Sequence, residues 1–400
     1  MRDTFNLSNA ETLSPIIFYY FDVKGTDAFI RMLEERFRQT GSRHPIVFRE
    51  WDCYETLPGE DGDLFAYDGV VLSALASKGL LMPLPDELTA DGVFPWVLEK
   101  SKYWNKTFGI PFIMCSNALI CRKKDAQDIR GIIDLHEPVA IPIQSMLMFY
   151  FIQALCSNRD LHRSMKVMDH LLDLIGVRDF LTESDSGDYD GVDRFNREEC
   201  RYLLGFTEDI MNCKNDRYTV RFEDFSNSRK SRQTLFMVDF VSVAKHVRGE
   251  KLRDCLTLLK IMADEQFTYD LCTADGRLQY LLPANMRVFP RLAELDPLYD
   301  ELFSLLESGN NGLLRYGRRY YEDFNRQESL LFQLLCEKAG WKLDGAGGET
   351  VFPEALEKDA NRMERLRKCS AYFCGRKRPA HTLLQTPPEG LLRVDPPKCL

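Results

Sequence analysis

The chain's 12 cysteines are the first residues to consider for chemistry, because a thiolate is a strong nucleophile. A free thiol with a pKa of about 8.5 is only a few per cent ionised at neutral pH, so a reactive cysteine needs a base or a positive environment nearby. Cys115 lies in the apolar run GIPFIMCSNALICR (109–122), which predicts a buried strand, and Cys121 follows in the same run. A cysteine in a strand is usually an inert core residue. The pattern alone leaves both thiols open between core filling and catalysis.

The spacing of the other cysteines and of the histidines does not support a metal site. The sequence contains no CxxC pair and no HExxH motif. Cys369, Cys374 and His381 are of the types that bind zinc, but their spacing is not that of a standard zinc site. The basic segment 362–379 contains aromatic residues, and a solvated helix and tail explains it better than an RNA-binding site. We therefore expect neither a metal nor a cofactor.

The composition of the 400 residues is that of an ordinary globular protein, with 44% hydrophobic and 28% charged residues. The net charge of −9 argues against nucleic-acid and anionic-membrane partners. No apolar run approaches the roughly 20 residues that span a bilayer, and residues 1–15 lack the apolar core of a signal peptide. The scattered cysteines suggest a reducing compartment. These features predict a cytoplasmic protein.

Alternating strands and helices are predicted for the first hundred residues. The expected strands are 14–23, 44–52 and 63–71, and the expected helices are 25–41, 72–79 and 91–104. Such alternation predicts a parallel sheet covered by helices. In sheets of this kind, sites form outside the carboxyl ends of the strands. Asp68 lies near the end of the third strand, so Asp68 and Cys115 are expected to face the same crevice.

The remainder of the chain is predicted to be largely helical. The Met- and Phe-rich stretch 145–156 fits a buried helix better than a cofactor-binding segment. A strand is expected over 235–243 and helices from 249 to 336, followed by a linker at 343–350. The length allows two or three domains or one large two-lobed protein.

Several of these segments resemble thiaminase I (thiamine pyridinylase), a family built on the fold of bacterial extracellular solute-binding proteins. In KTFGIPFIMCSNALICRK (106–123), Gly109-Ile110-Pro111 followed by Cys115-Ser116-Asn117 is similar to the family's turn and catalytic cysteine. The other similar segments are FREWDCYE (48–55), GDLFAYDGVVLSALASKGLLMPL (62–84), LLGFTEDI (203–210), LFMVDFVSV (235–243) and LQYLLPA (278–284). The likeness covers about residues 14–325.

The resemblance implies roles for four polar residues. Cys115 resembles the nucleophile, and Glu208 resembles the base that activates it. Asp68 and Asp239 resemble the carboxylates that hold the aminopyrimidine of the substrate. The implied reaction displaces the thiazole of thiamine and transfers the aminopyrimidine to an amine, pyridine or thiol through a covalent cysteine intermediate.

The resemblance also implies an aromatic substrate pocket, with departures from the family. The matching pocket aromatics are Tyr54, Tyr189 and Tyr20. Where the family commonly has tyrosine, this chain has Phe18, Phe206 and Met237. These changes remove hydroxyl groups from the substrate-binding residues and leave the nucleophile and the base in place.

The fold implied by the resemblance is a two-lobed α/β fold of the type II periplasmic-binding-protein class, with a ligand cleft between the lobes. We expect residues 14–117 and 239–335 to form the first lobe and 118–238 the second. Residues 340–400 are expected to be a C-terminal extension that is partly disordered.

Two alternatives to thiaminase activity remain open at this point. A non-catalytic binding protein for thiamine or a related pyrimidine would have the same fold, but the cysteine and glutamate argue against it. A divergent transferase acting on another heteroaromatic substrate would account for the missing tyrosines. A monomer is expected, and the resemblance makes secretion the alternative to a cytoplasmic location.

Overall fold

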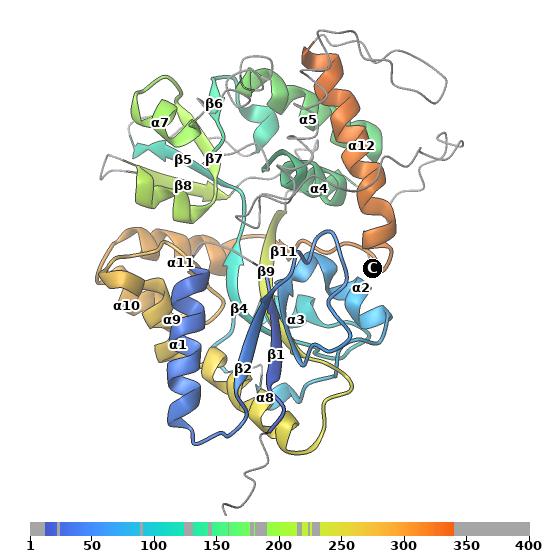
Figure 1. Ribbon diagram of the computed structural model, residues 1–400. Coiled ribbons are helices and arrows are strands. Elements are labelled where there is room, and N and C mark those ends of the chain that lie inside the picture. Colours follow the sequence, from blue (N-terminus) through green and yellow to red (C-terminus); the bar gives the residue numbers. More distant parts are fainter. Residues whose placement is uncertain are drawn as a thin grey trace, which may run out of the picture.

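The computed structural model describes residues 13–339, and the gaps in this range are 22–24, 89–90, 124–130, 143–145, 159, 177–179, 181–189, 214–217, 223–224 and 226–232. The described residues form two lobes, each built on its own β-sheet (Figure 1). Tyr189, the zinc-type residues Cys369, Cys374 and His381, the basic segment 362–379 and the expected extension 340–400 lie outside the described residues.

The first lobe contains a seven-stranded mixed sheet with the order β10-β4-β9-β3-β1-β2, in which β11 also pairs with β9. Its strands are β1 (Ile16–Tyr20), β2 (Ile46–Glu50), β3 (Leu64–Asp68), β4 (Ile110–Cys115), β9 (Thr234–Val243), β10 (Leu282–Pro283) and β11 (Asn311–Leu313). The predicted parallel pairing holds for β1 with β2 and β3. The strand β9, for which the sequence predicted no direction, runs antiparallel to β3 and β4 because it returns from the second lobe and not through a helical crossover.

Helices cover this first sheet, as the spacing of apolar residues predicts. They are α1 (Thr26–Gln39), α2 (Leu72–Ser77), α3 (Pro95–Ser101), α8 (Gly249–Ala263), α9 (Glu265–Cys272), α10 (Phe289–Ala293) and α11 (Leu298–Ser308). In α1, Phe29, Leu33 and Phe37 recur every four residues and are all buried, so one face of the helix packs on the sheet.

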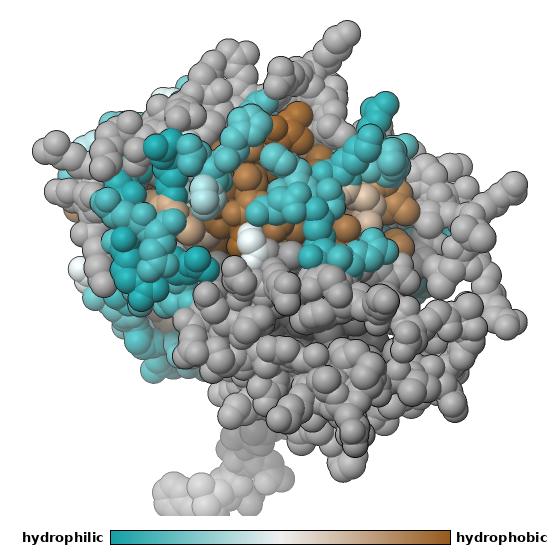
Figure 2. All heavy atoms as spheres, turned by 90° about the horizontal axis from the view of Figure 1, so that it is seen from above, coloured by the Kyte–Doolittle hydropathy of each residue, from teal (hydrophilic) through white to brown (hydrophobic). Residues whose placement is uncertain are grey.

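The second lobe contains a four-stranded sheet with the order β6-β7-β5-β8. Its elements are β5 (Ala118–Arg122), β6 (Val139–Ala140), β7 (Tyr202–Gly205), β8 (Tyr218–Phe222), α4 (Met146–Asn158), α5 (Leu161–Ile175) and α7 (Gly191–Asn196). Residues 146–156 of α4 are all buried, which confirms the prediction of a buried helix. Figure 2, which looks down on the molecule from above, shows apolar residues ringed by hydrophilic ones among the described residues.

Short 3₁₀ turns complete the two lobes. They are η1 (Gly69–Val71), η2 (Asp86–Leu88), η4 (Ile132–Asp134), η5 (Thr207–Asn212), η6 (Ala274–Gly276) and η7 (Met286–Val288). Of these, η1 directly follows β3, and η5 begins two residues after the end of β7.

The run 109–122, expected as a single strand, is two strands that belong to different sheets. β4 ends at Cys115 in the first sheet and β5 begins at Ala118 in the second, so Ser116 and Asn117 form a crossing between the lobes. Gly109 precedes β4 where the chain passes close to β9. A Cβ there would lie 2.7 Å from Ser242 Oγ and 3.2 Å from the Val241 carbonyl oxygen, which is why a glycine fits.

The last described helix, α12 (Tyr320–Ala339), runs along the second lobe beside α4 and α5 (Figure 1). Lys338 Nζ lies 2.8 Å from Asp169 and 2.7 Å from Asp173, both on α5. Among the described helices, none is long and apolar enough to cross a membrane.

Candidate active site

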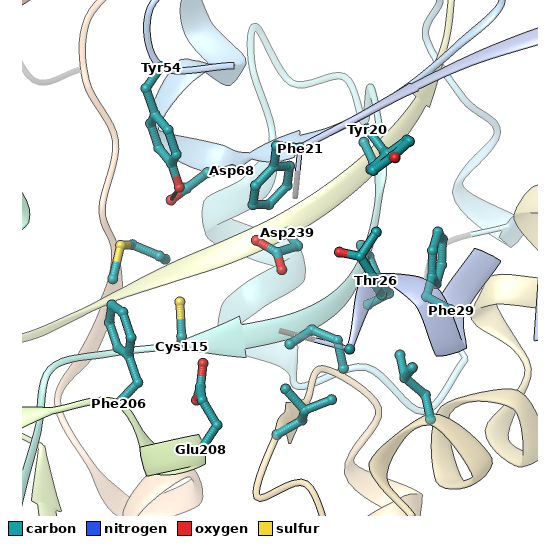
Figure 3. Close-up of a pocket in the computed structure, with 17 residues that line it drawn as sticks. Tyr20, Phe21, Thr26, Phe29, Tyr54, Asp68, Cys115, Phe206, Glu208 and Asp239 are labelled. Atoms are coloured by element: carbon teal, nitrogen blue, oxygen red, sulfur yellow. Dashed lines mark hydrogen bonds between the residues drawn. The ribbon is translucent and has the colours of Figure 1, made fainter. Parts of the chain in front are cut away.

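A cavity of about 90 Å³ lies between the two lobes, at the end of β4 (Figure 3). Its floor is one face of the first sheet, because alternate residues of a strand point to the same side. Ala66 and Asp68 of β3, Met237 and Asp239 of β9, and Ile113 and Cys115 of β4 all line it. The second lobe contributes Phe206 and Glu208.

Asp68 is the last residue of β3 and is held by two hydrogen bonds. Its Oδ1 accepts from the Val70 amide at 2.9 Å, which caps η1, and its Oδ2 accepts from the Tyr54 hydroxyl at 3.0 Å. Burial raises the pKa of Asp68 to about 6, although both hydrogen bonds act to lower it. The carboxylate is therefore oriented from two sides but is protonated more easily than an exposed aspartate.

Asp239 lies directly opposite Asp68 in the antiparallel register of β3 and β9. Side chains at such positions stand about 5 Å apart. Burial raises the pKa of Asp239 well above its usual value, and the nearby charges of Asp68 and Glu208 raise it further. Two carboxylates this close do not both ionise readily, so the pair favours one protonated and one ionised partner.

Cys115 is the last residue of β4 and pairs with Met237 of β9. Its sulfur points into the cavity between Asp239 and Glu208 (Figure 3). Burial raises the pKa of Cys115 well above its usual value, and the charges of Asp239, Glu208 and Asp68 add to this effect. The resting group is thus a neutral thiol that needs a base before it can attack.

Glu208 reaches the cavity from the second lobe. It is the second residue of η5, which begins just after β7, and Thr207 Oγ1 donates to its Oε2 at 3.4 Å. In Figure 3 its carboxylate points toward the Cys115 sulfur. The neighbouring Asp209 points elsewhere, because its Oδ2 accepts the Phe206 amide at 2.9 Å. The fold therefore selects Glu208 of the two adjacent acids as the one that faces the thiol.

Tyr54 connects the aromatic part of the site to Asp68. The carboxylate of Asp52 accepts the Tyr54 and Glu55 amides at 2.9 and 3.2 Å and forms the turn that places the ring. The Tyr54 ring then packs edge-on against Phe149 of α4, with centroids 5.2 Å apart. This turn explains why a Trp-Asp-x-Tyr stretch positions a phenol at the cavity.

Eight of the ten residues singled out in the sequence line this cavity. They are Cys115, Glu208, Asp68, Asp239, Tyr54, Tyr20, Phe206 and Met237. Phe18 does not line it, although it is on the same face of β1 as Tyr20, because it is fully buried against Phe29 and Phe48. Tyr189 lies outside the described residues.

Several lining residues were not expected from the sequence. They are Phe21, Gly25, Thr26, Phe29, Ala66, Phe112, Ile113, Leu271 and Leu281. Phe112 and Ile113 are consecutive in β4, and strict alternation would send only one of them to the cavity. The register of β4 against β9 shifts between Pro111 and Ile113, and this irregularity lets both residues reach it.

The cavity has an acidic end and an apolar wall, and these decide which ligands it can bind. Three carboxylates and one thiol meet at the end of β4, and none of the described lining residues is Lys, Arg or His. Such a site favours a cationic ligand with an aromatic or apolar part. The described residues contain no group of three or more His, Cys, Asp or Glu side chains arranged to hold a metal.

Comparisons with known proteins find similar chains among the thiaminases. The chain is 26% identical to Thiaminase-1 of Paenibacillus thiaminolyticus over 313 residues, which are 68% of this chain and 76% of that protein. The structure of Clostridium botulinum thiaminase I in complex with thiamin matches with a TM-score of 0.70 at 20% identity, over 80% of this chain and 99% of that chain. No protein-family model matches the chain.

The fold extends beyond the thiaminases. A maltodextrin-binding protein of L. casei matches with a TM-score of 0.56 at 11% identity, over 90% of this chain and 99% of that chain. These similarities confirm the predicted resemblance to thiaminase I and the predicted two-lobed fold of the solute-binding class.

Proposed function

We propose that this chain, a homologue of thiaminase-1, is a thiamine pyridinylase-type transferase. It displaces the thiazole of thiamine and transfers the aminopyrimidine to a nucleophilic amine, pyridine or thiol. The observation that carries the proposal is the meeting of Cys115, Glu208, Asp68 and Asp239 in one buried cavity between the lobes. These four residues come from four different elements, and a binding protein that does no chemistry has no need of a thiol facing a carboxylate.

The two aspartates bind different groups of the aminopyrimidine. Asp68, whose pKa is about 6, is ionised at neutral pH and accepts a hydrogen bond from the exocyclic amino group. Asp239, whose pKa is raised well above its usual value by burial and by the charges of Asp68 and Glu208, keeps its proton and donates it to a ring nitrogen. Protonation or hydrogen bonding at that nitrogen draws electrons from the ring, which makes an otherwise poor electrophile open to attack.

The transfer proceeds in two displacements at the pyrimidine. Glu208 takes the proton of Cys115, and the thiolate adds to the activated ring. The bond between the methylene and the thiazolium nitrogen then breaks, and its electron pair leaves with a neutral thiazole. The acceptor attacks the methylene, the carbon–sulfur bond breaks, and Cys115 recovers its proton. The covalent route divides one difficult substitution into two easier ones.

The electrostatics of the cavity favour a cationic substrate. The thiazolium of thiamine carries one positive charge, which is attracted to the three carboxylates around Cys115. This positive charge offsets the negative charges of the carboxylates, which raise the pKa of Cys115. Substrate binding therefore favours ionisation of the thiol. The apolar wall, which includes Phe206 and Met237, packs against the uncharged parts of the substrate.

The proposal is tested by measuring thiazole release from thiamine with aniline or pyridine as the acceptor. We expect release that depends on the acceptor, together with formation of the pyrimidine–acceptor product. Thiamine binding without thiazole release would instead indicate a non-catalytic binding protein. Release from a different heteroaromatic substrate, with none from thiamine, would indicate a divergent transferase.

A further inference from the structure

A buried hydrogen-bond network joins the segment that crosses between the lobes after Cys115 to β9 of the first sheet. Gln153 of α4 is at its centre. Its Oε1 accepts from Asn117 Nδ2 at 2.5 Å, and its Nε2 donates to the Leu235 carbonyl oxygen at 3.1 Å. Ser116 Oγ donates to the same carbonyl at 3.0 Å. Ser116, Asn117 and Gln153 are all at most 1% exposed.

The network begins where the backbone pairing of β4 with β9 ends. The last paired residues of β4 and β9 are Cys115 and Met237. Beyond this pair the β4 segment leaves the first sheet and Asn117 leads directly into β5 of the second, whereas β9 remains in the first sheet, where Leu235 pairs with Gly312 of β11. Side chains therefore replace the β4–β9 ladder at the crossing, and Gln153, on a helix of the second lobe, connects Asn117 of the crossing to Leu235 of β9.

This crossing sets the relation between Cys115 and Glu208. Cys115 ends β4, whereas Glu208 follows β7, which pairs with β5 so that Ala118 is opposite Gly205. The connection from the thiol to the carboxylate thus runs through Ser116 and Asn117. Asp68 and Asp239, by contrast, are joined to each other by the ladder of β3 and β9 within the first lobe.

We propose that Gln153 is a positioning residue, which fixes the angle at the crossing and thereby holds Glu208 of the second lobe against Cys115 of the first. It touches no substrate atom and acts through Asn117 and the Leu235 carbonyl. The inference rests on the proposed function for its kinetic part only, since the distance between base and thiol also governs the reactivity of the free enzyme.

The network contains one feature that stability alone does not explain. Asn117 Oδ1 is buried and accepts no hydrogen bond from any described residue. A buried acceptor without a donor is unfavourable, and an apolar side chain of similar shape would avoid this cost. In this proposal, the role of Asn117 is the geometry that its Nδ2 imposes on Gln153.

The test compares the parent protein with Gln153→Leu, which keeps the size of the side chain and removes both of its hydrogen bonds. We expect kcat for thiazole release to fall roughly tenfold or more, while KM for thiamine changes less than about twofold, because the aspartate pair is unaffected. Alkylation of Cys115 by iodoacetamide, followed by mass spectrometry of its peptide, should become faster and begin at lower pH. Burial and the charge of Glu208 both raise the pKa of this thiol, and a loosened crossing relieves both, whereas Asp239 stays beside Cys115 in the first sheet.

The matched control is Tyr150→Phe on the same helix. The Tyr150 hydroxyl donates to the Leu204 carbonyl at 2.6 Å, so the variant also loses one buried hydrogen bond, but within the second lobe. It should leave kcat and the alkylation profile of Cys115 unchanged. Ser116→Ala, which removes only the hydroxyl bond to Leu235, should shift both readouts in the same direction as Gln153→Leu but less.

Parent-like kcat and alkylation in folded Gln153→Leu would overturn the inference, and so would equal changes in Tyr150→Phe. If Gln153→Leu does not fold, Ser116→Ala decides, and an unchanged alkylation profile in that variant counts against the inference. If the parent protein releases no thiazole, the proposed function fails, but the alkylation profiles still decide whether Gln153 positions the two lobes around Cys115.

Discussion

Asp68 and Asp239 lie directly opposite each other on the antiparallel strands β3 and β9, and both are at least nine-tenths buried. Burial raises the pKa of both carboxyls, to about 6 for Asp68 and well above its usual value for Asp239, whose pKa is also raised by the charges of Asp68 and Glu208. The pair therefore favours one ionised and one protonated member at neutral pH. A site with one acceptor and one donor at this spacing suits an aminopyrimidine, which offers a donor and an acceptor side by side.

The raised pKa of Asp68 predicts that its ionised carboxylate destabilises the folded protein at neutral pH. Because the pKa is about 6 when folded and 3.8 normally, the folded state binds the proton more tightly, and stability falls as pH rises between these values. Asp68→Asn avoids this loss. Its free energy of unfolding at pH 7 should exceed that of the parent by about 1–3 kcal/mol, and the difference should vanish below about pH 4.

Asp63→Asn is the matched control for that measurement. Asp63 is also buried, but it accepts the Ile17 amide at 2.9 Å and a hydrogen bond from Lys251 Nζ at 3.0 Å. Removing its charge leaves Lys251 without its ion-pair partner and should lower stability. Denaturant titrations at pH 4 and pH 7 check both variants, and a less stable Asp68→Asn at pH 7 contradicts the account.

The pH dependence of thiazole release should reflect the ionisation of Asp68. In the proposed function the carboxylate form of Asp68 accepts the amino group of the pyrimidine, so kcat/KM should decline as pH falls below about 6. The Tyr54 hydrogen bond lowers the pKa of Asp68, so Tyr54→Phe should move this decline to higher pH. Tyr67→Phe, which loses only a hydrogen bond to Ser242, should leave it in place. An acid limb that Tyr54→Phe does not move would argue against Asp68 as the titrating group.

Loss of the proposed base, Glu208, should lower the pKa of Cys115 and yet slow the reaction of Cys115 with substrate. Glu208→Gln should lower kcat by roughly 100-fold or more with binding largely retained, the scale typical of a missing general base. The same variant should lower the pKa of Cys115, because the Glu208 charge raises it. Asp209→Asn, which keeps an acceptor for the Phe206 amide, serves as the control and should remain active. A fully active Glu208→Gln protein would refute the role.

Much of this architecture could be predicted from the sequence, because the spacing of apolar residues indicates which face of a helix or strand is buried. The strands 14–23 and 63–71, the helix 25–41 and the buried helix 145–156 all have counterparts in β1, β3, α1 and α4. Spacing does not record the direction of a strand that returns from another lobe. The antiparallel course of β9 was therefore missed.

The candidate site was predictable only in part, for three physical reasons. The register shift beside Pro111 brings Phe112 to the cavity against the expected alternation. Phe18 is on the same face of its strand as Tyr20, but Phe29 of α1 packs against it and separates it from the cavity. Gln153 lies in an apolar helical stretch, and its hydrogen bonds to two distant segments follow from tertiary structure alone.

The two phenylalanines in place of family tyrosines should respond differently to restoration of the hydroxyl. Phe206 lines the cavity two residues before Glu208, so Phe206→Tyr adds a hydrogen-bonding group worth about 0.5–1.5 kcal/mol to the substrate site. The KM for thiamine should fall by about two- to tenfold. Phe18→Tyr instead buries a hydroxyl in the core beside Phe29 and Phe48 and should destabilise the fold without improving KM. If Phe206→Tyr leaves thiamine turnover unchanged or worse, and another aminopyrimidine is a better substrate of the parent, thiamine is not the substrate.

The central claim is that Cys115 forms a covalent bond to the pyrimidine, and mass spectrometry tests it most directly. Incubation with 4-amino-6-chloropyrimidine, or with thiamine in the absence of an acceptor, should add the mass of a single pyrimidine group to the intact protein. Among the 12 cysteines, the added mass should map to the peptide that contains Cys115 and should be absent from Cys115→Ser. Modification of a different cysteine, or modification that persists in Cys115→Ser, would contradict the account.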